Sequence, residues 1–175
     1  AERDVLEPLR RWADMLIDTS ELSANELQQF VRQNFETQEA GELSVTVSSF
    51  GFARGMPPLA DLVFDMRFLD NPHWDDDLRE LTGLDEPVAE FLGQTDGFEE
   101  NFVRIRDLLL DLLPRYQAQG KSYVHIAFGC TGGRHRSVYT AERIAHALRE
   151  NGFKPTTTHR NLASRAADAV ELQTA

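Results

Sequence analysis

The chain has 175 residues, of which 41% are hydrophobic and 27% are charged, a composition typical of one folded domain with a short extension. Its single cysteine excludes an intrachain disulfide framework, and no apolar run reaches the ~20 residues that span a bilayer. The net charge of −11 argues against a surface that binds nucleic acid generally. No positively charged, apolar start resembles a signal peptide, so we expect a cytoplasmic protein without membrane association.

The first 40 residues have the pattern of a helix, a strand and a second helix. Helical spacing over 2–13 is followed by a short apolar run at 15–18, which predicts a strand. Residues 23–26 form a capping box ahead of a helix that begins near Leu27. So few elements bury little apolar surface by themselves. We therefore interpret residues 1–40 as a linker remnant or the tail of a preceding domain, and residues 41–175 as the functional domain.

Strands and helices alternate through the rest of the chain. The predicted strands lie at 43–50, around 62–64, at 122–128 and at 155–159, and the predicted helices lie at 87–92, 98–116 and 137–150. This alternation predicts an α/β fold with a mixed or largely parallel sheet flanked by helices. In such sheets ligands collect beyond the carboxyl ends of the strands.

One loop stands out at such a carboxyl end. Residues 130–137 read Cys-Thr-Gly-Gly-Arg-His-Arg-Ser and lie between a buried strand and a helix. Glycines let backbone N–H groups turn inward, the helix start is positive, and Arg134 and Arg136 supply forked donors suited to phosphate oxygens. We predict an anion-binding loop here, with the irregular stretch that carries Asn71 and His73 as its second wall.

The same loop supports a second hypothesis. It fits Cys-x-x-Gly-x-x-Arg-Ser, the pattern of the cysteine phosphatase loop. In a phosphatase of this kind, the Cys130 thiolate would be the nucleophile, Arg136 would bind the phosphate oxygens, and Asp75 is the candidate general acid. Gly129 stands where such phosphatases usually carry histidine. Cys130 as a small buried residue that ends a strand is a further open interpretation.

Two other groups of residues have alternative interpretations. Arg67 follows an apolar strand, so it either reaches the pocket or forms an ion pair with Asp65 or Asp85. The histidines and Cys130 lack the close pairs typical of zinc ligands, and we predict no metal site.

Several phrases resemble the RapZ family of bacterial P-loop nucleotide-binding proteins, in the family's order over nearly the whole chain. They are Leu-Glu-Pro-Leu-Arg (6–10), Asp-Thr-Ser-Glu-Leu (18–22), Ser-Phe-Gly-Phe (49–52), Phe-Asp-Met-Arg-Phe-Leu (64–69), Asn-Pro-His-Trp-Asp (71–75), Leu-Thr-Gly-Leu-Asp (81–85), Gly-Cys-Thr-Gly-Gly-Arg-His-Arg-Ser-Val-Tyr (129–139) and Thr-His-Arg-Asn-Leu (158–162). No Gly-x-x-x-x-Gly-Lys-[Ser/Thr] motif occurs, so the chain resembles the family's carboxy-terminal domain without its P-loop domain. ATP or GTP and any ATPase or GTPase activity would then belong to the missing domain, and we expect no cofactor here.

The resemblance implies a sensor of glucosamine-6-phosphate or a similar phosphorylated amino sugar. Carried over by motif, the pocket residues are His73, Cys130, Thr131, Gly132, His135 and Arg136, to which the loop argument adds Asn71, Gly133 and Ser137.

The resemblance also implies an RNA-binding adaptor that presents a small regulatory RNA to RNase E, and association into a homo-oligomer. The RNA-binding member ends in a basic tail, whereas residues 166–175 here carry two acidic residues and no basic one. The candidate RNA-binding cations are Arg54, Lys154, Arg160 and Arg165.

Overall fold

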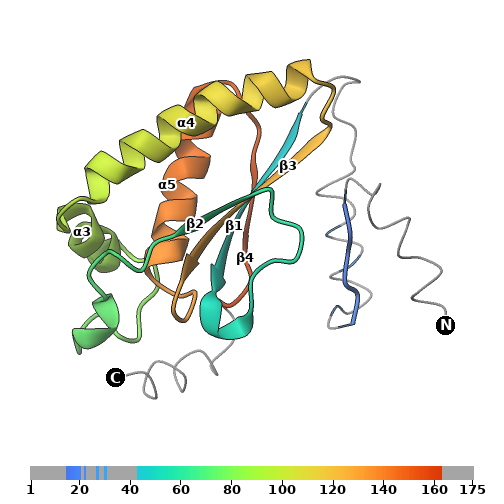
Figure 1. Cartoon of the computed structure of the whole chain (residues 1–175). Helices are drawn as coiled ribbons and strands as arrows, with labels where there is room; N and C mark the ends of the chain where they lie inside the picture. Colours follow the sequence, from blue (N-terminus) through green and yellow to red (C-terminus); the bar gives the residue numbers. More distant parts are fainter. Residues whose placement is uncertain (1–14, 21, 23–26, 28–29, 31–42, 163–175) are drawn as a thin grey trace.

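The computed structural model describes residues 15–20, 22, 27, 30 and 43–162. The helix expected over 2–13 and the candidate Arg165 lie outside the described residues. The strand predicted at 15–18 is wrong, because these residues have no regular structure. They lie beside the sheet on the side away from the helices, where no neighbouring strand supplies a ladder of hydrogen bonds (Figure 1). Leu27 and Phe30 are helical, as the capping box predicts.

Four parallel strands form the sheet in the order β2-β3-β1-β4. The strands are β1 (Ser44–Gly51), β2 (Leu62–Asp65), β3 (Tyr123–Cys130) and β4 (Thr156–His159). The helices are α3 (Glu86–Gln94), α4 (Phe98–Ala118) and α5 (Arg136–Glu150), with short 3-10 helices η1 (Phe52–Arg54) and η2 (Pro72–Trp74). The predicted α/β fold is confirmed, and every strand pairing among the described residues is parallel.

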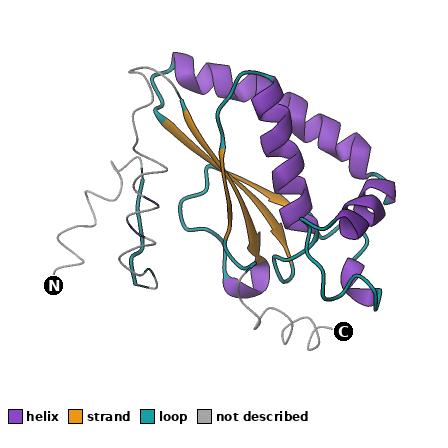
Figure 2. Ribbon diagram, turned by 180° about the vertical axis from the view of Figure 1, so that it is seen from behind, coloured by secondary structure: helices purple, strands orange, loops and turns teal. Residues whose placement is uncertain are grey.

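Helices α3, α4 and α5 lie on one side of the sheet (Figures 1 and 2). α5 packs against β1 and β3, and α3 and α4 pack on α5. Strand side chains alternate between faces, so Val45, Val47 and Ile126 enter the core under the helices. The opposite face, which we call the open face, carries Thr46, Ser48, Tyr123 and His125.

Because the strands are parallel, their carboxyl ends meet at one edge of the sheet. β1 ends at Gly51 and β3 at Cys130, and these two residues are direct register partners. The loop between β3 and α5 therefore begins in the middle of this edge. None of the described helices is long and apolar enough to cross a membrane.

Candidate functional site

The glycine loop, residues 131–135, lies directly against the end of β1. A Cβ atom on Gly51 would come within 2.6 Å of the Gly132 carbonyl carbon, so no side chain fits there. Gly133 has a φ of +79°, and a Cβ atom there would lie 2.5 Å from the Gly51 nitrogen. Close packing and backbone conformation thus both require glycine at this contact.

Cys130 lies at the base of the loop and is only 2% exposed. Its Sγ accepts a hydrogen bond from the Gly133 N–H at 3.2 Å and lies 3.1 Å from Ser137 Oγ. The sulfur therefore closes the loop onto the first turn of α5.

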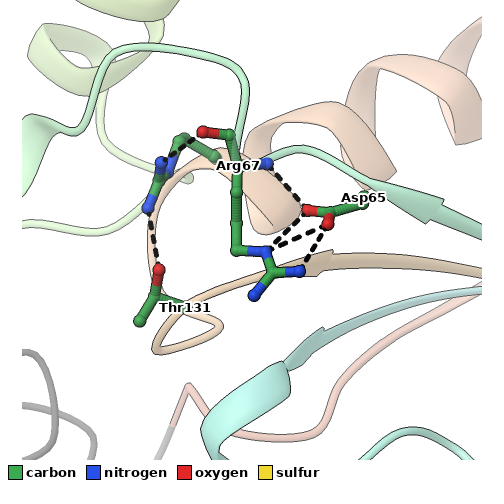
Figure 3. Close-up of polar contacts among 4 residues, drawn as sticks. Asp65, Arg67 and Thr131 are labelled. Carbon is green, nitrogen blue, oxygen red and sulfur yellow. Dashed lines mark hydrogen bonds and ion pairs between the residues drawn. The ribbon is translucent and has the colours of Figure 1, made fainter. Parts of the chain in front are cut away.

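Arg136 is 4% exposed and connects the loop to the segment after β2. Its Nη1 donates to the carbonyl oxygen of Arg67 at 3.3 Å and its Nη2 donates to Thr131 Oγ1 at 3.3 Å (Figure 3). Nη1 also donates to the carbonyl oxygen of Leu69 at 3.1 Å. This buried guanidinium fixes residues 67–69 beside the glycine loop.

A second arginine lies next to this arrangement. Arg67 donates from Nε to both carboxylate oxygens of Asp65 at 3.0 Å and from Nη2 to Oδ2 at 2.6 Å (Figure 3). Its guanidinium carbon lies 4.1 Å from the centre of the Phe52 ring. The hydrogen bonds from Arg67 hold the pKa of Asp65 below its usual value, and Arg136 contributes to this shift. Of the two interpretations open for Arg67, the structure shows the ion pair with Asp65.

Two histidines are buried beside the loop. His73 is 4% exposed in η2, where Asn71 Oδ1 accepts its backbone N–H at 3.4 Å. Burial and, to a smaller extent, the positive charge of Arg134 lower the pKa of His135 to about 4. His73 also contributes to this lowering, so the two rings are close enough to interact. At neutral pH His135 is therefore uncharged.

Two buried side-chain nitrogens, His135 Nε2 and Arg136 Nε, have no hydrogen-bond partner among the described residues. Buried polar atoms in native proteins nearly always have a partner. Both residues lie at the start of α5, where backbone N–H groups also lack intrahelical acceptors. The start of α5 thus combines unpartnered polar atoms with a positive electrostatic field.

Not every residue expected at the site takes part in it. Arg134 points away from the loop, since its Nε donates to the Leu81 carbonyl at 2.8 Å and its Nη2 to the Glu80 carbonyl. Asp75 Oδ1 accepts the Asp77 N–H at 2.9 Å within its own exposed turn, so Asp75 is engaged locally.

The candidate RNA-binding cations do not gather on one patch. Lys154 and Arg160 flank β4 at its opposite ends, and six residues of extended chain cover about 20 Å. Arg54 is exposed at the end of η1. Arg54 and Arg160 lie at the same edge of the sheet, without Lys154.

Sequence reasoning missed the support that β4 gives to the loop. Asn161 Oδ1 accepts the Gly51 N–H at 2.8 Å and lies close to Gly133. Two residues earlier on each strand, His159 Nδ1 lies 2.8 Å from Ser49 Oγ. The Nε2 of the same ring lies 3.0 Å from Glu142 Oε1. The only signal for these residues was the family phrase at 158–162.

The start of α5 and the unpartnered Nε of Arg136 are groups that suit an anion. Among the described residues, no group of three or more histidine, cysteine, aspartate or glutamate side chains could hold a metal ion.

Comparison with known proteins connects this site to a family. The sequence model of the RapZ C-terminal domain matches residues 43–163, which include the whole sheet and the glycine loop. The chain belongs to the RapZ family. The model of the RapZ-like N-terminal domain matches residues 1–39.

Relatives of this RapZ-family chain carry two kinds of name. A nucleotide-binding protein of Erythrobacter litoralis is 70% identical over 171 residues, which cover 98% of this chain and 57% of the relative. A nucleotide-binding protein of Novosphingobium aromaticivorans is 66% identical, over 98% of this chain and 56% of the relative. The RNase adapter protein RapZ of Serratia proteamaculans is 46% identical, over 94% of this chain and 58% of the relative. The chain thus spans about half the length of the curated relatives it matches.

Proposed function

We propose that this chain is the sensory region of a RapZ-type regulator and that its glycine loop binds a phosphorylated amino sugar such as glucosamine-6-phosphate. The pair of unpartnered buried nitrogens, His135 Nε2 and Arg136 Nε, carries the proposal. Membership of the RapZ family supports it.

The chemistry of the two nitrogens suggests the ligand class. The His135 ring is uncharged at neutral pH, because burial lowers its pKa to about 4, and a neutral ring has one nitrogen that donates and one that accepts. A sugar hydroxyl can both donate and accept, so it suits Nε2, which has no partner among the described residues. Arg136 Nε is a charged donor and suits a phosphate oxygen, with the start of α5 and Thr131 beside it.

Thermal-shift titration tests this proposal. Glucosamine-6-phosphate should raise the melting temperature, since saturating ligand at about 100 times Kd stabilises a fold by about 2.7 kcal/mol, whereas glucosamine should leave it unchanged. Arg136→Ala should abolish the shift and Thr131→Val should weaken it. Arg104→Ala, which removes an exposed arginine on α4, is the matched control. If glucosamine shifts the melting temperature as much as its phosphate does, the phosphate-binding role of the loop is wrong.

One observation favours cysteine phosphatase chemistry as a second candidate. The Gly133 N–H and Ser137 Oγ surround Cys130 Sγ, as hydrogen-bonding groups must if they are to stabilise a thiolate nucleophile. The Nη1 of Arg136, however, is directed to the carbonyl groups of Arg67 and Leu69. Hydrolysis of an aryl phosphate that disappears in Cys130→Ser and persists in the exposed-site variant Arg104→Ala would favour the phosphatase over the sensor.

We propose as well that the protein takes part in RNase adaptation, because the Serratia proteamaculans relative is named an RNase adapter protein. Presentation of a small regulatory RNA to RNase E and association into a homo-oligomer belong to this proposal. Gel shifts with a structured small RNA between 50 and 200 mM salt test it, and Arg54→Glu combined with Arg160→Glu should weaken binding more than Lys154→Glu does. Binding of micromolar strength or weaker that ignores RNA sequence would count against the adaptor role.

A further inference from the structure

A cavity of about 280 Å³ lies on the open face of the sheet, away from the glycine loop. We call it the sheet pocket. Its floor is made by Thr46, Ser48, Tyr123, His125, Thr158 and Arg160. Its walls are made by Met15, Leu16, Ile17, Leu22 and Phe30 on one side, and by Pro57, Pro58 and Leu59 on the other. Its volume is close to the lower end of the range for small-molecule sites, which is about 300–1,000 Å³.

The floor of the sheet pocket is polar although it is buried. Thr46 is 5% exposed and Ser48 is 1% exposed. Ser48 Oγ lies 2.7 Å from His125 Nε2, and Asp61 Oδ2 accepts the His125 backbone N–H at 2.8 Å, so the imidazole is held in place. Apolar walls over a few positioned polar groups are the usual composition of a small-molecule site.

The sheet pocket also lies where two family regions meet. The wall residues Met15, Leu16, Ile17, Leu22 and Phe30 fall in the match to the RapZ-like N-terminal domain. The residues of its floor fall in the match to the C-terminal domain. Figures 1 and 2 both show the described part of the N-terminal segment on the side of the sheet away from the helices. Ligand pockets form preferentially at domain interfaces.

The charges around the sheet pocket favour an anion. Arg160 lines it and forms no ion pair with any described residue. Burial lowers the pKa of His125, and Asp61 and Arg160 act on it in opposite directions, Asp61 raising it and Arg160 lowering it. Asp18 also lines the pocket, and its Oδ1 accepts the Ser20 N–H at 2.9 Å. The lining thus offers one available cation beside a neutral, hydrogen-bonding floor.

We propose that the sheet pocket binds a small aromatic anion, whose ring lies between the apolar walls and whose acidic group pairs with Arg160. Such a ligand would contact both family regions at once. Its binding would therefore stabilise the contact of residues 15–18, Leu22 and Phe30 with the sheet.

Fluorescence titration of the 175-residue chain with 8-anilinonaphthalene-1-sulfonate, an aromatic sulfonate, tests the proposal. We expect saturable binding with one site per chain. Arg160→Gln should weaken it at least about tenfold, because the variant loses the charge-assisted hydrogen bonds to the sulfonate. Thr158→Phe, which places a ring on the floor at a strand position, should block it, with circular dichroism confirming that the variant is folded.

Two matched variants separate this site from others. Lys154→Gln removes one positive charge at the opposite end of β4 and should leave the titration unchanged. Arg136→Ala should also leave it unchanged while abolishing the response to glucosamine-6-phosphate, so the two proposals fail independently. Binding that does not saturate, or that Arg160→Gln weakens no more than Lys154→Gln does, would overturn the proposal.

Discussion

His135 and Arg136 are neighbours in the chain and supply opposite chemistry at the start of α5. Burial keeps the His135 ring neutral, with a pKa of about 4, and its Nε2 has no hydrogen-bond partner among the described residues. Arg136 is also buried. Its Nη1 donates to two backbone carbonyl groups and its Nη2 to the Thr131 hydroxyl, while its Nε has no partner among the described residues. A ligand that fits both residues would carry a hydroxyl group close to an anion, as a phosphorylated amino sugar does.

The low pKa of His135 predicts a stability that depends on pH. An unfolded histidine binds a proton near pH 6.5, whereas His135 in the fold stays neutral down to about pH 4. The unfolded state therefore binds more protons between these values, so the free energy of unfolding should fall as the pH drops from 6.5 to 4. The contribution is at most about 3 kcal/mol. Urea unfolding at pH 7.5 and pH 5 measures it.

A pair of substitutions assigns this effect to His135. His135→Gln should remove the share of the loss between pH 7.5 and 5 that His135 causes, and a remainder should persist because burial also lowers the pKa of His125. His146→Gln, at an exposed position later on α5, should leave the loss unchanged. Equal pH dependence in the wild type and His135→Gln would show that other groups cause it.

At the scale of elements, the shape of the glycine loop depends on its contact with the end of β1. Gly51 and Gly133 touch through their backbones, and Asn161, after β4, accepts the Gly51 N–H. The end of β1 and the residue Asn161 after β4 therefore hold the loop in the conformation that the ligand would meet.

This contact predicts different effects for two glycines of equal φ. Gly133 and Gly120 both have a φ of +79°, but a Cβ atom on Gly120 would meet nothing within 4 Å. Gly120→Ala should destabilise the fold by roughly 1–2 kcal/mol, the cost of a left-handed residue with a side chain. Gly133→Ala should cost about 1–3 kcal/mol more, because its Cβ would displace β1. Urea unfolding of both variants measures the difference, and similar values for the two would contradict the contact.

Much of this arrangement is predictable from local sequence. The strands and helices from residue 43 onward follow hydrophobic periodicity, and the loop at 130–137 is recognisable from its glycines and arginines. The strand predicted at 15–18 fails because an apolar run does not specify whether a partner strand lies beside it. The direction of Arg136, the pairing of β1 with β4 and the role of Asn161 depend on contacts between distant residues, which local patterns do not encode.

At the scale of the whole molecule, the two sites occupy different places on one sheet. The glycine loop lies at the carboxyl edge, and the sheet pocket lies on the open face against residues matched to the N-terminal domain. The net charge of −11 and the separation of Lys154 from Arg160 leave Arg54 and Arg160 as the described candidates for an RNA contact. Among the proposed functions, sensing at the loop is therefore the one that the described residues support best.

The most direct test of sensing at the loop is to map glucosamine-6-phosphate binding by amide NMR of the ¹⁵N-labelled chain. We predict saturable shifts of the Gly132, Gly133 and Arg136 amides, with the Gly120 and Gly152 amides unchanged at the ends of α4 and α5. Unchanged loop amides at millimolar ligand, or shifts confined to other parts of the chain, would contradict the proposed sensor.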